Sequence, residues 1–322
     1  MIHRDQFRAL VLENISLCRE HYRLVIRLDA FAATQPGMFI QIACRELELA
    51  EAAEQERDWT ANALPALVTP ELLAPLALLR RPFSLAGRRD TSQGVELDIV
   101  HRVVGVGTDW LSRLRPGACV HILGPIGNHF TLPVEDQPAI LVGGGVGIPP
   151  MIYLASQLAG RQAVVFSGAT TRDLLPLTIT ADVPPPAADS VAPLYNLAEF
   201  ARQGIGAVIS TDDGSYGFRG FVTQALERYL DQYLSGNAIR PVIYTCGPEP
   251  MMKRVADIAL ARGLQCQIAV ERAMACGMGT CQSCCIRVKK RDPQQPPLVG
   301  QDWCYRLACT DGPIFRATEL LW

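Results

Sequence analysis

The residues from Glu271 to Val288 constrain this chain more than any other stretch. The segment reads ERAMACGMGTCQSCCIRV and spaces Cys276, Cys281 and Cys284 as C-x4-C-x2-C, with two glycines between the first two cysteines. Glycine has no Cβ, so the backbone can turn back on itself at these positions without a steric clash. A loop of this kind can point several thiolates at one centre.

This spacing predicts an iron–sulfur centre. Four thiolates hold a [2Fe–2S] cluster, and C-x4-C-x2-C followed by a distant fourth cysteine is typical of the plant-type cluster. The fourth thiolate has to come from further along the chain, where Cys304 and Cys309 are both available. The spacing alone leaves the choice between these two cysteines open.

Other uses of cysteine fit the chain less well. A zinc site usually joins two closely spaced pairs of ligands, and only Cys281 and Cys284 form such a pair. A disulfide framework disagrees with the odd number of cysteines, 11, and with a start, MIHRDQFRAL, that is not a secretory signal. The remaining cysteines are expected to be small buried hydrophobic side chains. They are Cys18, Cys44, Cys119, Cys266 and Cys285.

Composition narrows the class of protein. A chain of 322 residues with 49% hydrophobic residues, 19% charged residues and a net charge of −2 indicates a soluble globular protein of two or three domains. This charge balance favours neither nucleic acid nor an anionic membrane as a partner. No apolar run reaches the roughly 18 residues of a membrane-spanning helix. We therefore expect a cytoplasmic protein.

The first part of the chain, placed at residues 1–134, predicts a small antiparallel β-barrel. Glycine and proline turns separate six short stretches with strand character. The strands are expected at Ala9–Asn14, His21–Leu28, Met38–Cys44, Pro82–Ala86, Val95–Val104 and Cys119–Leu123. The segment 46–79 is rich in Ala, Leu and Glu, so it is expected to form one or two helices inserted in the barrel.

After Pro138 strands alternate with helices, which predicts a Rossmann-like α/β domain with a parallel sheet at residues 135–265. The expected strands are Ala139–Val142, Ala163–Ser167, Ala207–Ser210 and Val242–Cys246. The expected helices are Met151–Gln157, Leu197–Gln203, Thr223–Tyr233 and Pro250–Ala261. The remaining residues, 266–322, contain the cysteine segment and are expected to form a small C-terminal [2Fe–2S] domain.

Three segments of the barrel domain have features of a flavin site. The run Arg81-Pro82-Phe83-Ser84 offers a guanidinium to a pyrophosphate, and a ring edge and a hydroxyl to a flavin. The strand Val100-His101-Arg102 follows. In the Gly107-Thr108 turn, Thr108 is expected to cap a short helix whose free N–H groups would face a phosphate. A plain β-turn-helix corner is the alternative interpretation of this turn.

Two segments of the α/β domain have features of a nucleotide site. Glycines lie where the first strand passes into a helix, and they would let the backbone approach a phosphate, although they do not form a G-x-G-x-x-G pattern. These glycines are Gly143, Gly144, Gly145 and Gly147. Cys246-Gly247-Pro248 ends another strand, and α/β sheets bind nucleotides at the carboxyl ends of strands. Cys246 is equally well interpreted as a buried core thiol.

The segments described above, taken in their order along the chain, resemble those of the ferredoxin-reductase superfamily. Within it, the segments Thr211 to Gly217 and Arg219 to Thr223 resemble the electron-transfer subunits of dihydroorotate dehydrogenase B. The cysteine segment also follows the nucleotide domain, as it does in those subunits. The resemblance covers nearly the whole chain apart from the segment 46–79.

The resemblance implies the cofactors and the fourth cluster ligand. It implies FAD held by Arg81 to Ser84, with Val100 to Arg102 along the cofactor and the Gly107-Thr108 turn at phosphate. It further implies NAD(P) in the α/β domain and a [2Fe–2S] cluster at the cysteines. The family has its fourth ligand in a C-x-D-G-P segment, which residues 309–313 match, so Cys309 is preferred to Cys304. No residue is assigned as a general acid or base.

The implied activity is electron transfer between NAD(P), FAD and the cluster on behalf of a separate catalytic subunit. That partner carries FMN and oxidises dihydroorotate to orotate in pyrimidine (UMP) synthesis, and the complex is expected to be a heterotetramer. The main alternative is the flavin and iron–sulfur subunit of an NAD(P)H–ferredoxin transhydrogenase or of a soluble hydrogenase. A stand-alone oxygenase reductase and a non-enzymatic redox-sensing or zinc-stabilised module are further alternatives.

Overall fold

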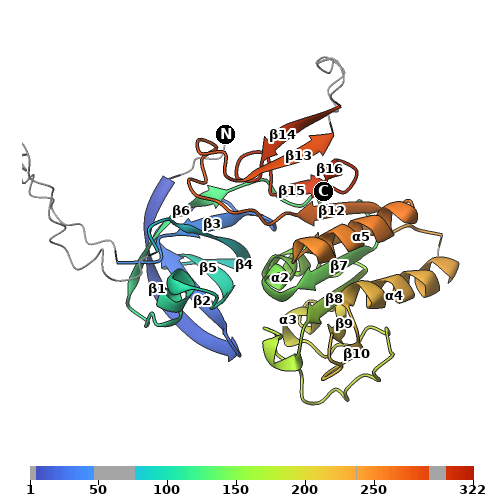
Figure 1. The fold of residues 1–322 in the computed structure, drawn as a ribbon. Helices are drawn as coiled ribbons and strands as arrows, with labels where there is room; N and C mark the ends of the chain where they lie inside the picture. The colour runs from blue at the N-terminus through green and yellow to red at the C-terminus, as the bar shows by residue number, and fades with distance from the viewer. Residues whose placement is uncertain (1–4, 47–76, 237, 290–301) are drawn as a thin grey trace, which may run out of the picture.

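The computed structural model describes residues 5–46, 77–236, 238–289 and 302–322, which form three units (Figure 1). The first is a closed antiparallel barrel with strand order β1-β2-β5-β4-β3-β6. Its strands are β1 Asp5–Cys18, β2 His21–Leu28, β3 Phe39–Ile42, β4 Arg81–Thr91, β5 Gly94–Arg102 and β6 Cys119–Ile126, with the short helix α1 Val106–Ser112 after β5. The predicted six-stranded barrel is confirmed. The predicted helices at 46–79 fall almost entirely outside the described residues.

The second unit is a seven-stranded sheet of order β10-β9-β8-β7-β11-β12-β15, with helices on both faces. Its strands are β7 Ala139–Gly144, β8 Ala163–Ala169, β9 Gly206–Thr211, β10 Phe218–Arg219, β11 Val242–Cys246, β12 Gln265–Ala269 and β15 Ile314–Arg316. Its helices are α2 Ile148–Ser156, α3 Ala198–Ala201, α4 Val222–Gly236 and α5 Glu249–Ala261, with short 3-10 turns η2 Gly145–Gly147 and η3 Arg172–Leu174. All strands but β15 pair in parallel, so the predicted Rossmann-like domain is confirmed.

The third unit contains the cysteine segment and a small sheet of order β14-β13-β16. Its strands are β13 Cys285–Lys289, β14 Trp303–Leu307 and β16 Leu320–Leu321. The chain beyond residue 265 also gives β12 and β15 to the sheet of the second unit. The domain limits expected at 134/135 and 265/266 stay predictions.

One hydrophobic core joins the three units. Phe39 and Ile126 lie on the outer face of the barrel and pack in the same cluster as Ile243 of the parallel sheet and Cys284 and Cys309 of the third unit. A separate cluster fills the inside of the barrel. Burial of a large apolar side chain contributes about 1.5–3 kcal/mol. The shared core therefore fixes the cysteines against the barrel and the sheet.

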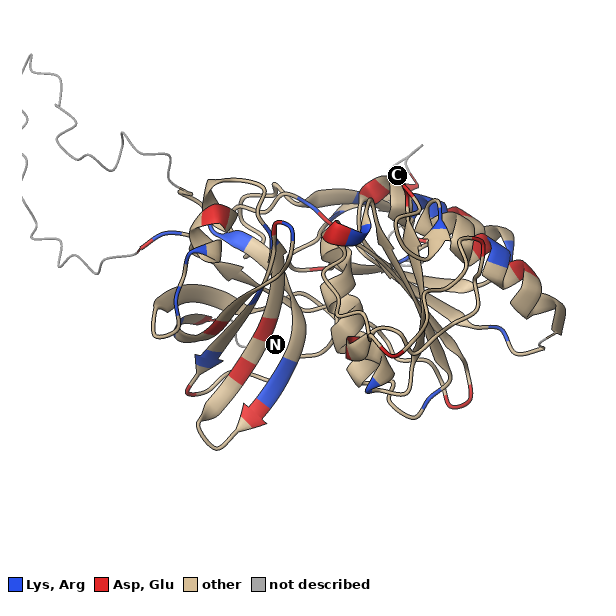
Figure 2. Ribbon diagram, turned by 90° about the horizontal axis from the view of Figure 1, so that it is seen from below, with Lys and Arg blue, Asp and Glu red and all other residues tan. Residues whose placement is uncertain are grey.

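Charged side chains of both signs are mixed over the barrel strands and over helices α4 and α5 (Figure 2). Several of them form ion pairs, such as Arg23 with Asp98 at 2.9 Å and Arg254 with Glu227 at 3.0 Å. In the part of the chain that the structure describes, no helix is long and apolar enough to span a bilayer.

The position of Gly147 generates a stability prediction. A Cβ at this residue would lie 2.1 Å from the carbonyl oxygen of Cys246, so one of two backbone segments would have to move. We expect Gly147→Ala to lower the free energy of unfolding by about 1–3 kcal/mol, as overpacking does. Unfolding in denaturant measures this difference in the free energy of unfolding. Gly236→Ala is the control, because no atom lies within 4 Å of a Cβ there. Equal stability of the two variants would contradict the close approach.

Candidate functional site

The cysteine segment forms a tight loop whose backbone N–H groups point at sulfur. Gly277 and Gly279 have φ of +67° and +87°, a conformation that L side chains rarely adopt. The N–H groups of Met278 and Cys281 each donate to Sγ of Cys276 at 3.4 Å. Thiolates are strong acceptors, so this loop is suited to hold a charged sulfur atom.

Cys281 is paired with Cys276 in this loop. Its Sγ lies 3.1 Å from the hydroxyl oxygen of Ser283. Hydrogen bonds to Ser283, followed by those to Cys276, lower the pKa of the Cys281 thiol to about 6. The thiolate is the metal-ligating form of cysteine. The surroundings of Cys281 therefore favour the state that a metal site needs.

Cys284 and Cys309 form a second, buried pair. Both are almost fully buried. Burial, followed by the hydrogen bond and charge of Cys284, raises the pKa of Cys309 to about 12, and the charge of Cys276 adds to this effect. Cys309 thus lies within electrostatic reach of both pairs. The structure thus brings Cys284 next to Cys309 and Cys276 next to Cys281, while the set of four ligands stays a prediction.

Two pairs suit a two-iron cluster, because each iron takes two thiolates. A single zinc ion instead needs four ligands around one point. Within the described ranges, no group of three or more His, Cys, Asp or Glu side chains, these four cysteines included, is placed to hold a metal ion. Cys304 lies on β14 opposite Val288 and packs at the edge of the hydrophobic cluster that contains Cys284 and Cys309.

The expectation of buried thiols holds for only some of the other cysteines. Cys44 and Cys266 are buried, whereas Cys18 and Cys119 are partly exposed and Cys285 is exposed. The prediction for Cys285 is wrong. Side chains alternate where β13 begins, so Cys284, just before the strand, points into the core and Cys285 points to solvent.

Asn128 joins the segment of the fourth cysteine to the barrel. Its side-chain Nδ2 donates to the carbonyl oxygens of Asp311 at 3.0 Å and Ile314 at 2.9 Å, and its Oδ1 accepts from the N–H of Ile314 at 2.8 Å. Its own N–H donates to the carbonyl oxygen of Gly312 at 2.6 Å. These four bonds fix the C-x-D-G-P segment at the end of β6. No local pattern in the sequence marks this contact, because Asn128 and its partners are more than 180 residues apart.

The Gly107 turn and Arg81, both expected at pyrophosphate, lie around Cys44. A Cβ at Gly107 would be 3.1 Å from Cβ of Cys44 and of Ala77, so a side chain there would have to push these neighbours back by a few tenths of an ångström. Burial raises the pKa of Cys44 to about 12, and the positive charge of Arg81 acts against this shift. The Arg81 guanidinium donates to the carbonyl oxygen of Leu79 at 2.9 Å. The structure therefore brings Arg81 and the Gly107 turn into one region.

Thr108 has a different role in its helix from the one expected. Gly105 is the N-cap of α1, and Thr108 is its third residue. The Thr108 hydroxyl oxygen accepts from the N–H groups of Val104 at 2.9 Å and Gly105 at 3.2 Å. Its side chain thus reaches back to the chain's own backbone, as the third residue of a capping box does. The expectation that Thr108 is the cap is wrong, while its contact with phosphate stays a prediction.

The side chains of the expected flavin strands point in two directions. Phe83 belongs to the core inside the barrel, and its ring meets the His101 ring edge-on at 6.1 Å. Pro82 and Ser84 lie on the opposite, outer face of β4, because successive side chains alternate. Of the next strand, Val100 is buried and Arg102 pairs with Glu20 at 2.8 Å.

His101 is a neutral imidazole in the barrel wall. It is 2% exposed and stacks on Tyr22 with ring centres 5.8 Å apart. Burial, followed by the nearby His21, lowers its pKa to about 4. Neither ring nitrogen of His101 has a hydrogen-bond partner among the described residues.

The two expected nucleotide-binding turns meet at the carboxyl edge of the parallel sheet. β7 and β11 are neighbours, and Gly143 is in register with Cys246. A Cβ at Gly247 would be 3.2 Å from the backbone nitrogen of Gly144. Burial, followed by the charge of Glu271, raises the pKa of Cys246 to about 12, so this thiol is uncharged. The two glycine turns therefore lie close together at this edge, and their contact with a nucleotide stays a prediction.

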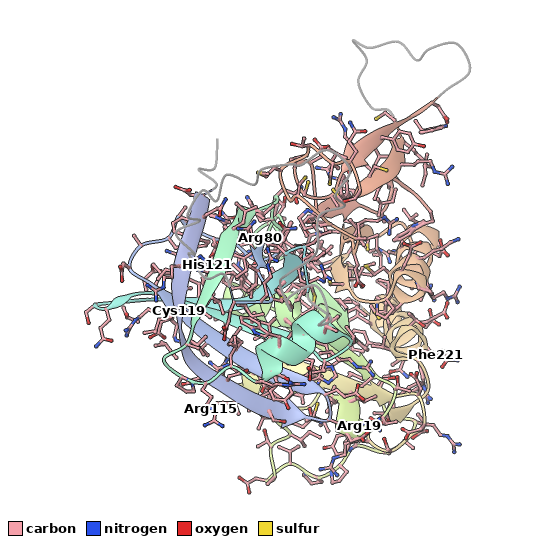
Figure 3. All side chains as sticks on the ribbon, turned by 60° about the vertical axis from the view of Figure 1, so that its left-hand side comes forward. Arg19, Arg80, Arg115, Cys119, His121 and Phe221 are labelled. Carbon is pink, nitrogen blue, oxygen red and sulfur yellow. The ribbon has the colours of Figure 1, made fainter. Side chains whose placement is uncertain are left out.

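Contacts between the barrel and the α/β unit hold the two expected sites side by side. Arg19, at the turn between β1 and β2 (Figure 3), forms an ion pair with Asp173 at 3.1 Å, and its N–H donates to the Asp173 carbonyl oxygen. Tyr153 of α2 donates its hydroxyl to the carbonyl oxygen of Thr34 at 2.9 Å. Sequence reasoning missed these residues, because no local pattern marks a contact between distant segments.

Comparison with known proteins places the chain among electron-transfer proteins. The sequence profile of the iron–sulfur cluster binding domain of dihydroorotate dehydrogenase B matches residues 271–321. The dihydroorotate dehydrogenase B (NAD(+)) electron transfer subunit of Geobacillus thermodenitrificans is 34% identical, with 100% of each chain covered. The one of Caldanaerobacter subterraneus is 30% identical over 99% of each chain. Among solved structures, a chain of the NADH-dependent reduced ferredoxin–NADP oxidoreductase has a TM-score of 0.66 and 25% identity, covering 98% of this chain and 90% of that one.

The Asn128 bonds generate a prediction. Asn128→Leu removes three side-chain hydrogen bonds at nearly the same volume, which should cost about 2–4 kcal/mol in the attachment of the third unit. We expect purified variant protein to hold less iron and to lose it faster to a chelator, as measured by iron assay. Asn14→Leu is the control, because Asn14 Nδ2 likewise donates to three backbone carbonyls, at Leu111, Ser112 and Leu114, but next to helix α1. Equal iron loss in both variants would contradict a specific role for Asn128.

Proposed function

Because the chain belongs to the family of electron-transfer subunits of dihydroorotate dehydrogenase B, we propose that it passes electrons between a [2Fe–2S] cluster, FAD and NAD(P). A partner catalytic subunit oxidises dihydroorotate to orotate, a step of pyrimidine synthesis. The observation that carries this proposal is the packing of the matched iron–sulfur domain, with Cys284 and Cys309 buried next to each other, against the outer face of the barrel.

A bound flavin exchanges a hydride with a nicotinamide and single electrons with an iron–sulfur cluster, which is the chemistry that couples the two ends of the chain. The protein holds and orients these groups. Cys276, Cys281, Cys284 and Cys309 would hold the cluster through their thiolates. The N–H groups of Met278 and Cys281 stabilise the negative charge on the sulfur of Cys276.

FAD lies along the barrel. Arg81 and the Gly107 turn bind its pyrophosphate, because a guanidinium and free backbone N–H groups both favour phosphate oxygens. Pro82 and Ser84, on the outer face of β4, contact the flavin ring, and Ser84 offers it a hydroxyl. Val100 lines the cofactor beside them. Phe83 and His101 are buried in the barrel wall behind it, and Arg102 ends the strand beside them.

The dinucleotide binds at the carboxyl edge of the parallel sheet. Gly143, Gly144, Gly145 and Gly147 admit the pyrophosphate, and Cys246, Gly247 and Pro248 border the nicotinamide. Asp212 and Asp213 follow β9, two strands from β7. A carboxylate there accepts from the ribose 2′-hydroxyl and repels a 2′-phosphate. These two charges, together with the NAD(+) in the names of the relatives, favour NAD over NADP.

The partner is a catalytic subunit that carries FMN, and the complex is a heterotetramer in the cytoplasm. Exposed apolar side chains near the cysteine loop support a docking surface there, with Met278 57% exposed and Tyr305 62% exposed. All eleven cysteines are free, which suits a reducing compartment.

A second candidate function is the flavin and iron–sulfur subunit of an NAD(P)H–ferredoxin transhydrogenase. It is favoured by the structural likeness to the NADH-dependent reduced ferredoxin–NADP oxidoreductase. The two functions differ in partner. Copurification followed by mass spectrometry separates them: an FMN protein that oxidises dihydroorotate supports the first, and a large multi-cluster flavoprotein supports the second.

Replacing single cysteines tests the cluster ligands. We expect Cys276→Ser and Cys309→Ser to remove the visible absorption and the electron paramagnetic resonance signal of the cluster while FAD stays bound. Cys304→Ser and Cys285→Ser are matched controls, because these thiols lie outside the two sulfur pairs, and they should keep about two irons per chain. Loss of the cluster in Cys304→Ser but not in Cys309→Ser would contradict the ligand set.

Replacing Arg81 tests the flavin site. Arg81→Ala removes a charge-assisted contact to pyrophosphate, so FAD affinity should fall roughly 10- to 150-fold, or about 1.5–3 kcal/mol. Equilibrium titration of the FAD-free protein with FAD measures the change. Arg80→Ala is the control, because Arg80 (Figure 3) instead donates to Oε1 of Gln6 at 2.9 Å. An unchanged affinity in Arg81→Ala would count against this placement of FAD.

A further inference from the structure

Gln41 is a buried amide that the fold leaves without a hydrogen-bond partner. It lies on β3 and its side chain is 0% exposed. Among the described residues, neither Oε1 nor Nε2 has a partner. An unpaired polar group in a protein interior is costly, because it has lost water and gained nothing in exchange. A buried side chain of this kind indicates a polar group that binds next to it.

The amide faces the cysteine loop. A Cβ at Gly277 would lie 2.6 Å from Oε1 of Gln41, 2.9 Å from its Cδ and 3.3 Å from its Nε2. Gly277 follows Cys276 directly, in the tight turn between the first two cysteines of the site. Only a glycine at this position lets the loop approach the amide so closely. Gln41 is thus packed against the loop that surrounds the sulfur atoms.

Gln41 also lies beside the flavin strand. It is in register with Pro82 of β4. Phe39, two residues before it and on the same face of β3, is in register with Ser84. Phe39 shares a hydrophobic cluster with Cys284 and Cys309, so this face of β3 is turned toward the third unit. The amide therefore lies between the strand expected to bind the flavin and the loop expected to bind the cluster.

We propose that Gln41 is a positioning residue for electron transfer, whose side-chain amide donates a hydrogen bond from Nε2 to a sulfur atom of the iron–sulfur centre. This inference rests on the proposed function. The N–H groups of Met278 and Cys281 approach Cys276 Sγ from within the loop. Gln41 adds a further donor from the barrel side in this proposal, once its amide is oriented with Nε2 toward the sulfur atoms. Hydrogen bonds to cluster sulfurs are among the factors that set reduction potential. A donor here stabilises the more negative, reduced state, so it raises the potential.

The test compares Gln41→Met with the unchanged chain, both loaded with iron and FAD. Methionine keeps an unbranched side chain of similar length but has no N–H group. We expect the electron distribution between cluster and flavin to shift about tenfold away from the cluster, which is 59 mV for a one-electron couple. A redox titration followed by electron paramagnetic resonance measures the cluster potential, and the flavin potential should stay unchanged.

Thermal unfolding of the iron-free proteins gives a second readout that does not depend on activity. Without the cluster the amide has no partner, so Gln41→Met should raise the melting temperature. Gln267→Leu is the control, because both side-chain atoms of Gln267 are bonded to Thr131, each at 2.8 Å. That variant should lower the melting temperature.

The outcomes separate this inference from the proposed function. Failure of the wild-type protein to bind iron would contradict the proposed function itself. Iron-loaded Gln41→Met with an unchanged cluster potential would overturn only the role of Gln41. A shift confined to the flavin potential would also overturn it, because the amide would then serve the flavin.

Discussion

The attachment of the C-terminal unit to the outer face of the barrel is the constraint on which the rest of the structure depends. Burial of apolar side chains supplies the attraction, and Phe39, Cys284 and Cys309 lie in the same hydrophobic cluster. Burial is not directional, so it cannot by itself set the position of a sulfur atom to a few tenths of an ångström. Asn128 adds direction through four bonds to the backbone of residues 311–314.

The same attachment joins two expected sites in which glycine has different roles. At the carboxyl edge of the parallel sheet, Gly143 and Gly147 lack a Cβ, so the turn after β7 packs closely against helix α2 and the end of β11. At the cluster end, glycines at Gly277 and Gly279 bend the loop so that its N–H groups point inward at sulfur. Between them, the barrel gives a rigid wall, because its strands close on themselves and its interior is filled by apolar side chains.

The sequence was informative wherever the signal is local. Strand alternation and turn residues predicted the six-stranded barrel, and the exact spacing of Cys276, Cys281 and Cys284 predicted a sulfur site. The fourth ligand was harder, because Cys304 and Cys309 are equally placed along the chain. Only the resemblance to a family selected Cys309. In the structure Cys309 lies in hydrogen-bond contact with Cys284, and Cys304 lies on β14 opposite Val288.

Other features lay beyond sequence reasoning for a physical reason. Asn128 and Gln41 gain their roles from residues about 180 and 236 positions away, and no local pattern encodes such a contact. Thr108 was expected to be a helix cap, since a hydroxyl at a helix start commonly is, but the helix begins earlier and its hydroxyl reaches backward. The segment 46–79 lies almost wholly outside the described residues, so its expected helices stay a prediction.

The central claim is that one chain connects a hydride donor to a one-electron acceptor. Anaerobic titration of the iron- and FAD-loaded chain with NADH, without any partner, tests this most directly. The account predicts that the flavin absorbance bleaches and that the electron paramagnetic resonance signal of a reduced [2Fe–2S] cluster develops with it. Complete bleaching of the flavin by NADH while the cluster stays oxidised, although dithionite reduces it, would contradict the account.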